Sequence, residues 1–196
     1  MDIYLVRHGE TNWNIQSRIQ GGIDVGLNEK GIEQAREVSR HFPADFNCDL
    51  LVSPLRRAVE TADILEDRVE ARIYEELDFL RELDQGYWNG LRVQELKNRL
   101  DPRRYKNWLD DPLRHSPPGG ESLEVVKERV SRGLKEATKK FEGPLVIVAH
   151  KVVNSIIAHL GGEWPFEEVM DSLPENAAVL EIELKCEENK AVKIEK

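Results

Sequence analysis

Short apolar runs alternate along the chain with longer stretches in which apolar residues recur every three or four positions. The short runs are rich in β-branched residues and predict strands at 2–6, 49–53, 145–149 and 178–184. The stretches 29–42 and 121–141 carry their apolar residues on one face and predict amphipathic helices. A third, more apolar helix is predicted over 152–160.

Strands that alternate with helices of this length are typical of βαβ units. We therefore expect an α/β protein with three layers, in which helices cover both faces of a mainly parallel sheet. The last predicted strand is followed by a polar turn at 186–190 and a second apolar run at 191–194, which predicts an antiparallel hairpin at the edge of the sheet. That edge is a candidate contact for a homodimer.

The length of 196 residues suits one domain, 1–196, with a substantial core. Between about residues 85 and 120 the pattern changes, because prolines and aromatic residues interrupt the periodicity around a single short helical stretch. We interpret this segment as an excursion that forms a lid or wall over a site.

Composition narrows the function. The net charge is −9, and no run of Lys or Arg exceeds two residues, so we expect neither a nucleic-acid partner nor an anionic membrane surface. The two cysteines, Cys48 and Cys186, match no metal-binding spacing and indicate a reducing compartment. No signal peptide and no apolar run of about 18 residues is recognised, which favours a cytoplasmic protein.

Polar residues follow three of the predicted strands where each one ends. Arg7 and His8 follow the first, Ser53 and the pair Arg56–Arg57 the second, and His150 the third. The carboxyl ends of parallel strands meet at one edge of the sheet, where ligands bind. Cations and imidazoles that gather there need an anionic partner, and arginine forks suit a phosphate. Two histidines could also hold a metal, but the Arg7 cation and the lack of a nearby carboxylate pair disfavour a divalent ion.

Six segments together resemble, in order, the motifs of the histidine phosphatase superfamily, whose fold is that of phosphoglycerate mutase. They are LVRHGETNWN (5–14), QGGIDVGLNEKG (20–31), SPLRRAVETA (53–62), LRELDQGYWNG (80–90), PPGGES (117–122) and IVAH (147–150). The resemblance spans nearly the whole chain and implies a phosphatase that works through a phosphohistidine, without a metal or another cofactor.

The resemblance also implies roles for individual residues. His8 would attack phosphorus, with its other ring nitrogen donating to a backbone carbonyl. Arg7, Arg57 and His150 would surround the phosphoryl oxygens, in place of the magnesium ion of other phosphotransferases. Arg57 is preferred to Arg56, because the arginine directly before alanine is the phosphate ligand in the family pattern. Glu82 would be the proton donor and a substrate contact, by its place in LRELDQG, against the rival carboxylates Glu75, Glu76, Asp78 and Asp84.

Further substrate contacts are expected at Asn14, Gln20 and Gly21, although a plain polar loop would explain these residues as well. Lys151 departs from the family pattern, which commonly has glycine after the second histidine. Its backbone N–H could still serve a phosphate oxygen, and its side chain could alter substrate choice. The other histidines have structural interpretations, except that His115 in the excursion could touch a substrate; Cys48 is expected to be a buried apolar residue.

Three functions are compatible with these motifs: a phosphatase, a phosphoglycerate mutase, and a phosphate-binding module without turnover. The resemblance favours the phosphatase branch, near α-ribazole phosphatase and metal-independent phosphoserine phosphatase, because cofactor-dependent mutases carry an added segment after the catalytic glutamate. The substrate is a small phosphomonoester whose identity stays open between α-ribazole phosphate, phosphoserine, and sugar or glycerate phosphates. The aromatic residues of 85–120 could stack on a ring of that substrate or form a small core of their own.

Overall fold

A computed structural model describes residues 1–141, 143–172 and 175–184. Its centre is a five-stranded sheet in the order β3-β2-β4-β1-β5. The strands are β1 (Asp2–Arg7), β2 (Phe46–Val52), β3 (Val69–Glu76), β4 (Leu145–Ala149) and β5 (Val179–Glu183). All neighbours pair in parallel except β5, which pairs antiparallel with β1. The predicted α/β class with a mainly parallel sheet and an antiparallel edge strand is confirmed.

The central strands bury both faces, so alternate residues of one strand enter two different cores. In β4, Leu145, Ile147 and Ala149 pack into one core, while Val146 and Val148 pack into the other. This is why the run reads as continuously apolar and not as an alternation of apolar and polar residues.

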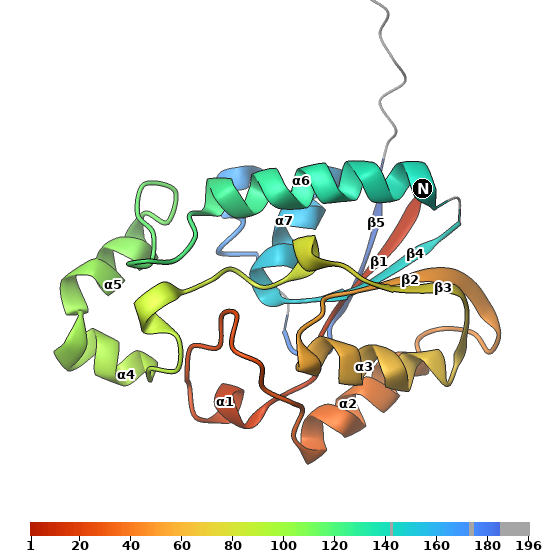
Figure 1. Cartoon of the computed structure of the whole chain (residues 1–196), viewed down its shortest axis with the longest axis horizontal. Helices are drawn as coiled ribbons and strands as arrows, with labels where there is room; N and C mark the ends of the chain where they lie inside the picture. Colours follow the sequence, from red (N-terminus) through yellow and green to blue (C-terminus); the bar gives the residue numbers. More distant parts are fainter. Residues whose placement is uncertain (142, 173–174, 185–196) are drawn as a thin grey trace, which may run out of the picture.

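Helices cover both faces, which completes the three layers (Figure 1). The helices α6 (Leu123–Lys140) and α7 (Lys151–Gly161) contribute to the first core, and α2 (Glu29–Ser39) and α3 (Arg56–Glu66) to the second. Side chains define two of the starts, because Asn28 caps the first turn of α2 and Ser122 caps that of α6.

Several boundaries differ from the prediction. The 29–42 helix ends at Ser39, and the strand expected at 49–53 begins three residues earlier, at Phe46. The strand β3 and the helix α3 were not predicted. Beyond Val69, β3 is half-buried or exposed, because it is an edge strand, so it lacks the apolar run that marks a central strand. The hairpin expected at 186–194 lies outside the described residues.

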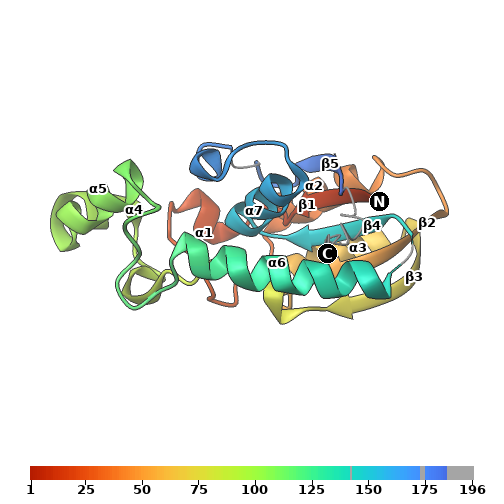
Figure 2. The same cartoon turned by 90° about the horizontal axis from the view of Figure 1, so that it is seen from above.

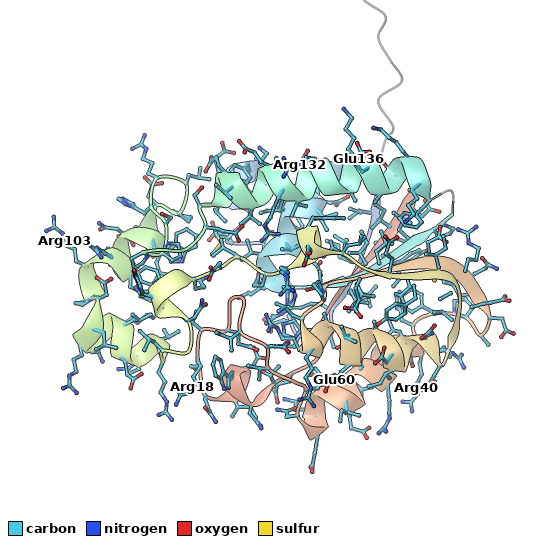
Figure 3. All side chains as sticks on the ribbon, in the orientation of Figure 1. Arg18, Arg40, Glu60, Arg103, Arg132 and Glu136 are labelled. Atoms are coloured by element: carbon cyan, nitrogen blue, oxygen red, sulfur yellow. The ribbon has the colours of Figure 1, made fainter. Side chains whose placement is uncertain are left out.

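The excursion at 85–120 is more helical than predicted. It contains a 3-10 turn η2 (Gly86–Trp88), a short helix α4 (Val93–Glu95), a π-helical turn η3 (Leu96–Leu100) and the helix α5 (Pro102–Asp110). Figures 1 and 2 place α4 and α5 beyond the end of the sheet toward which β1 runs. Figure 3 shows Arg103 reaching outward from α5.

Three aromatic residues of this excursion are buried in the first core, the one to which α6 and α7 contribute. Trp88, Tyr105 and Trp108 are all buried, and the rings of Trp88 and Tyr105 meet edge to face. Trp88 also donates its indole N–H to Asp101. Tyr87, by contrast, is 81% exposed. No helix among the described residues is long and apolar enough to cross a membrane.

Candidate active site

The two histidines predicted at the strand ends do lie side by side. Arg7 is in register with Ala149 across the parallel pair of β1 and β4, and the His8 N–H donates to the Ala149 carbonyl at 3.1 Å. His8 and His150 therefore leave the sheet from adjacent positions, with their ring centres 5.2 Å apart. Both side chains are buried.

His8 has a defined tautomer. Its Nδ1 lies 2.7 Å from the Gly9 carbonyl, which can only accept, so Nδ1 carries the proton and Nε2 carries the lone pair. This is the backbone partner that the resemblance implied. Burial lowers the pKa of His8 well below 6.5, and the charges of Arg57 and Arg7 lower it further. His8 is thus a neutral imidazole at pH 7.

His150 is oriented by a serine that the sequence analysis did not assign a role. Its Nε2 lies 2.7 Å from Ser53 Oγ, which also accepts the Leu55 N–H. A serine hydroxyl donates one hydrogen bond and can accept two, so Nε2 either accepts from Ser53, with the ring proton on Nδ1, or donates to it. That Nδ1 is buried and makes no hydrogen bond with the described residues. Burial, followed by the charge of Arg57, lowers the pKa of His150 well below 6.5.

Arg57 is a buried cation, only 1% exposed, at the start of α3. Its Nη1 and Nη2 donate to the carbonyls of Ile23 and Gly21, both at 2.8 Å, while its Nε is buried without a partner among the described residues. Burial lowers the pKa of Arg57 to about 10, which leaves it charged at pH 7. Arg56 instead faces solvent and pairs with the half-buried Glu60. The choice of Arg57 over Arg56 is consistent with this burial.

Arg7 is also buried and lies in the same cluster. Burial lowers its pKa, and the nearby carboxylates of Glu82 and Glu175 partly offset that shift. Glu175 was missed by the sequence analysis. It follows a segment of no recognisable motif, so no local signal pointed to it.

Glu82 reaches the same region from the loop after η1 (Asp78–Leu80). Its Oε2 accepts the N–H of Val152 at 3.3 Å, and its Oε1 accepts the N–H of Leu83 at 2.8 Å. Val152 is two residues after His150, so Glu82 lies at the positive N-terminal end of α7 beside the imidazole cluster.

The rival carboxylates are engaged elsewhere. Asp78 pairs with Arg81 at the surface, and Glu75 pairs with Lys140 on α6. Glu76 is exposed at the end of β3. Asp84 holds its own loop by accepting from the N–H of Gly86 and the side chain of Asn89. Of the five candidates, Glu82 alone contacts α7 in the described residues.

The loop after β1 connects the remaining candidates. The Thr11 side chain caps α1 (Asn12–Ile15), and the Asn14 amide oxygen accepts from the Thr11 N–H in return. Gln20 accepts from the Thr11 hydroxyl. Gly21 has a positive φ of 48°, and a Cβ there would lie 2.1 Å from Asn89 Oδ1, so the turn that brings its carbonyl to Arg57 excludes a larger residue. Whether Asn14 and Gln20 touch a substrate stays a prediction.

Lys151 is the first residue of α7, and its side chain is exposed. Burial of part of the side chain and the charge of Arg7 lower its pKa, while Glu175 and Glu82 act in the opposite direction. The lysine that departs from the family pattern therefore lies at the rim of the cluster, within range of Arg7 and Glu82.

A pocket of about 510 Å³ adjoins Glu82. Its lining comes from the loop after Gly21, from the loop that carries Glu82, and from the start of α6: Gly22, Ile23, Asp78, Arg81, Glu82, Asp84, Asn89, Glu121 and Arg129. Glu82 connects this pocket with the histidine cluster, while His8, His150, Arg7 and Arg57 are not part of its lining.

The other polar candidates lie away from the cluster. His41 is exposed near the end of α2, and His159 bonds the Trp164 carbonyl through Nδ1. His115 is exposed in the turn before Pro117. Cys48 is buried in β2, as expected, and burial raises its pKa to about 11. Within the described residues, no group of three or more His, Cys, Asp or Glu is arranged to hold a metal ion.

The sequence model of the histidine phosphatase superfamily, branch 1, matches residues 3–196. The chain belongs to this superfamily. It is 34% identical over 184 residues to "Uncharacterized phosphatase PhoE" of Bacillus subtilis, a match that covers 92% of this chain and 87% of that one. It is 32% identical over 151 residues to "Phosphoserine phosphatase 1" of Hydrogenobacter thermophilus, covering 76% and 71%.

Solved structures agree. Bacillus stearothermophilus YhfR superposes with a TM-score of 0.84 at 30% identity, covering 94% of this chain and 92% of that one. A putative α-ribazole-5′-P phosphatase from Escherichia coli gives a TM-score of 0.77 at 28% identity, covering 92% and 89%. The histidine phosphatase described here is accordingly a hydrolase with the phosphoglycerate-mutase-like fold.

The buried neutral imidazoles predict how the stability of this phosphatase depends on pH. In the unfolded chain His8 and His150 take up protons near pH 6.5, whereas in the folded chain they do so only at much lower pH. Their contribution is therefore complete above pH 6.5 and is lost as the pH falls below it, by at most about 1.4 kcal/mol per pH unit for each ring.

The free energy of unfolding in urea, measured between pH 7.5 and 5 in buffer without phosphate, checks this. The double variant His8→Asn/His150→Asn should show a shallower fall than the wild type, while His41→Asn should keep the full slope. Equal slopes for the wild type and the double variant would contradict the buried neutral state.

Proposed function

We propose that this phosphatase hydrolyses a small-molecule phosphomonoester through a phosphohistidine on His8, with Glu82 as proton donor and without a metal. The observation that carries the proposal is the pair of neutral imidazoles, 5.2 Å apart, buried together with two arginines. Arg57 forms none of the described ion pairs, and the charges of Glu82 and Asp24 only partly offset its burial, so a tetrahedral dianion is the ligand that this charge favours.

His8 has the features of a nucleophile for phosphorus. Because its Nδ1 donates to Gly9, the lone pair on Nε2 is available for attack. The low pKa caused by burial and by the two arginines keeps that lone pair free of a proton. Attack forms an N–P bond, and the bond between phosphorus and the ester oxygen breaks.

The neighbours of His8 are donors suited to the negative charge of the transferring phosphoryl group. Arg57 presents its buried Nε, and Arg7 adds a second guanidinium. His150 would present a protonated Nδ1 in the tautomer whose Nε2 accepts from Ser53. Fixed donors in a buried site stabilise a transition state more than mobile water does, which is the role a magnesium ion has in other phosphotransferases.

Glu82 supplies the protons. In the first step its carboxylic acid protonates the departing ester oxygen, which would otherwise leave as an alkoxide. In the second step the resulting carboxylate takes a proton from water, whose oxygen attacks phosphorus, and the N–P bond breaks to release phosphate and neutral His8. The contact with the Val152 N–H places this carboxylate beside His150. Asn14, Gln20, Gly21 and Lys151 would add substrate contacts around this centre.

Hydrolysis is favoured over mutase chemistry and over binding alone. The chain has only a short segment after Glu82 in place of the added segment of cofactor-dependent mutases, and a pocket beside Glu82 leaves room for water. Both His8 and Glu82 are present, whereas a binding module would need neither. Relatives named as phosphoserine, α-ribazole and glucosyl-3-phosphoglycerate phosphatases act on quite different alcohols, so we leave the leaving group open among small phosphomonoesters.

Replacing the nucleophile should stop the reaction. His8→Ala should lower kcat by at least about 10³-fold, because no other described residue can form the intermediate. Rapid quenching with a ³²P-labelled substrate should give an acid-labile label on the wild type and none on His8→Ala. The matched control His41→Ala, at an exposed histidine, should keep both activity and label. Labelled His8→Ala protein would refute the proposed nucleophile.

Replacing the proton donor should separate substrates by leaving group. Glu82→Gln should slow the first step on an alkyl phosphate by about 10²-fold to 10⁴-fold, because an alkoxide needs a proton. The pre-steady-state burst of nitrophenolate from p-nitrophenyl phosphate should change far less, since that group leaves as a stable anion. Glu76→Gln, at an exposed rival carboxylate, should alter neither. Similar losses on both substrates would argue against Glu82 as the acid.

A panel of small phosphomonoesters, assayed for phosphate release with and without EDTA, tests class and metal requirement together. We expect at least one ester to be hydrolysed at the same rate after EDTA treatment and dialysis. A parallel assay of 3-phosphoglycerate isomerisation should detect little activity. Activity restored only by added Mg²⁺, or isomerisation faster than every hydrolysis, would overturn the corresponding part of the proposal.

A further inference from the structure

An arginine on α6 contacts the loop of Glu82 at several backbone positions. Arg129 donates through Nη1 to the Phe79 carbonyl at 2.8 Å and through Nη2 to the Glu82 carbonyl at 3.3 Å. It therefore bonds the carbonyl of the proposed acid itself and that of a residue three positions earlier. Arginine suits this task because its donors are held in one rigid plane.

Glu121 completes the contact from the other side of the loop. Its carboxylate accepts from Arg129 in a two-point pair, Nε to Oε1 at 2.9 Å and Nη2 to Oε2 at 3.0 Å. The same Oε2 accepts the N–H of Asp84 at 3.0 Å, and the Glu121 N–H donates to the Asp84 carbonyl at 2.9 Å. The ion pair thus holds the backbone on both sides of Glu82.

A glycine on the same face of α6 fixes the distance between helix and loop. Gly133 lies one turn after Arg129, and a Cβ at that position would lie 2.1 Å from the ring of Phe79. Glycine is unfavourable within a helix compared with alanine, so its position here is explained by the close approach of the loop. The Arg129–Glu121 ion pair and the close approach at Gly133 therefore both locate the loop of Glu82 against α6.

We infer that Arg129 and Glu121 are positioning residues, which hold the Glu82 carboxylate where it can protonate the leaving group. This inference rests on the proposed role of Glu82. Neither residue is predicted to touch the phosphoryl group; both act through the backbone of residues 79–84. Since a misplacement of about 1 Å can cost about 10²-fold in rate, loss of the ion pair should impair the proton transfer specifically.

The test uses the same pair of substrates as the Glu82 variant. Arg129→Met keeps most of the apolar stem but removes the donors, and it should slow the first step on an alkyl phosphate by about 10-fold to 10²-fold. The nitrophenolate burst should change little, and the readout is the ratio of the two first-step rates, because Arg129 also lines the pocket beside Glu82 and its loss can change KM. Arg132→Met is the matched control, because Arg132 lies on the outer surface of α6 and faces away from the loop (Figure 3).

Two further variants separate geometry from charge and from folding. Arg129→Lys keeps the charge but cannot form the planar fork, so it should resemble Arg129→Met; full rescue by lysine would contradict positioning. Glu121→Gln removes the negative charge of the pair. It should also slow the first step on the alkyl ester more than on p-nitrophenyl phosphate, but by a smaller factor than Arg129→Met. If Arg129→Met does not fold, Glu121→Gln tests the positioning role in its place.

A double variant connects the effect to Glu82. If Arg129 acts through Glu82, then Glu82→Gln/Arg129→Met should be no slower on the alkyl ester than Glu82→Gln alone. Additive losses, or equal losses on both substrates, would overturn the inference and indicate a general structural or substrate-binding role. If Glu82→Gln itself shows no difference between the substrates, the proposed acid fails, and that result is distinguishable from failure of the positioning pair.

Discussion

The structure is organised around a buried positive charge. The Arg57 guanidinium is almost completely removed from water, and no carboxylate among the described ion pairs neutralises it. Such burial is costly unless hydrogen bonds and an opposite charge compensate for it. Two of its nitrogens, Nη2 and Nη1, donate to the backbone carbonyls of Gly21 and Ile23. Burial, followed by this same charge, lowers the pKa of the two neighbouring imidazoles, so both stay unprotonated beside the expected site of an anionic ligand.

The parallel sheet makes this cluster possible. Adjacent strands β1 and β4 end at the same level, where the His8 N–H bonds Ala149, and β2 ends beside β4, where the Ser53 N–H bonds Val148. Each strand then delivers its polar residue to the same place without any loop having to cross the molecule. The two cores on the faces of the sheet pack around the ends of these strands. Such packing suits a site whose hydrogen-bond donors must stay fixed.

The loop that carries Glu82, the proposed acid, is supported by a helix and not by a strand. Glu82 lies on a loop, and loops are less precise supports for catalytic groups than strands or helices. The Arg129–Glu121 pair and the close approach at Gly133 attach that loop to α6. The Val152 N–H donates to the Glu82 carboxylate. The helix that covers one face of the sheet therefore also supports the pocket beside it.

Most of the predicted elements came from the periodicity of apolar residues, and the predicted family came from the order of the motifs. The buried central strands were recognisable because burial on both faces requires continuous apolar runs, as at 145–149, and the residues after them could be placed at one edge because parallel strands share a direction. The edge strand β3 was invisible, since its half-exposed side chains need no apolar pattern. The sequence could not show whether the aromatic residues of 85–120 line a substrate pocket or pack into a core. Only the structure shows that Trp88, Tyr105 and Trp108 are buried in the first core.

By itself, the sequence therefore determined the fold class, and it predicted the strand-end residues Arg7, His8, Arg57 and His150 and, from a motif, Glu82. What only the tertiary structure decided was which distant groups support them: Ser53 on His150, Glu175 near Arg7, and Arg129 with Glu121 on the loop of Glu82. A hydrogen bond between residues far apart in the chain leaves no periodic trace in either segment, because it depends on where folding brings two atoms and not on the neighbours of either residue.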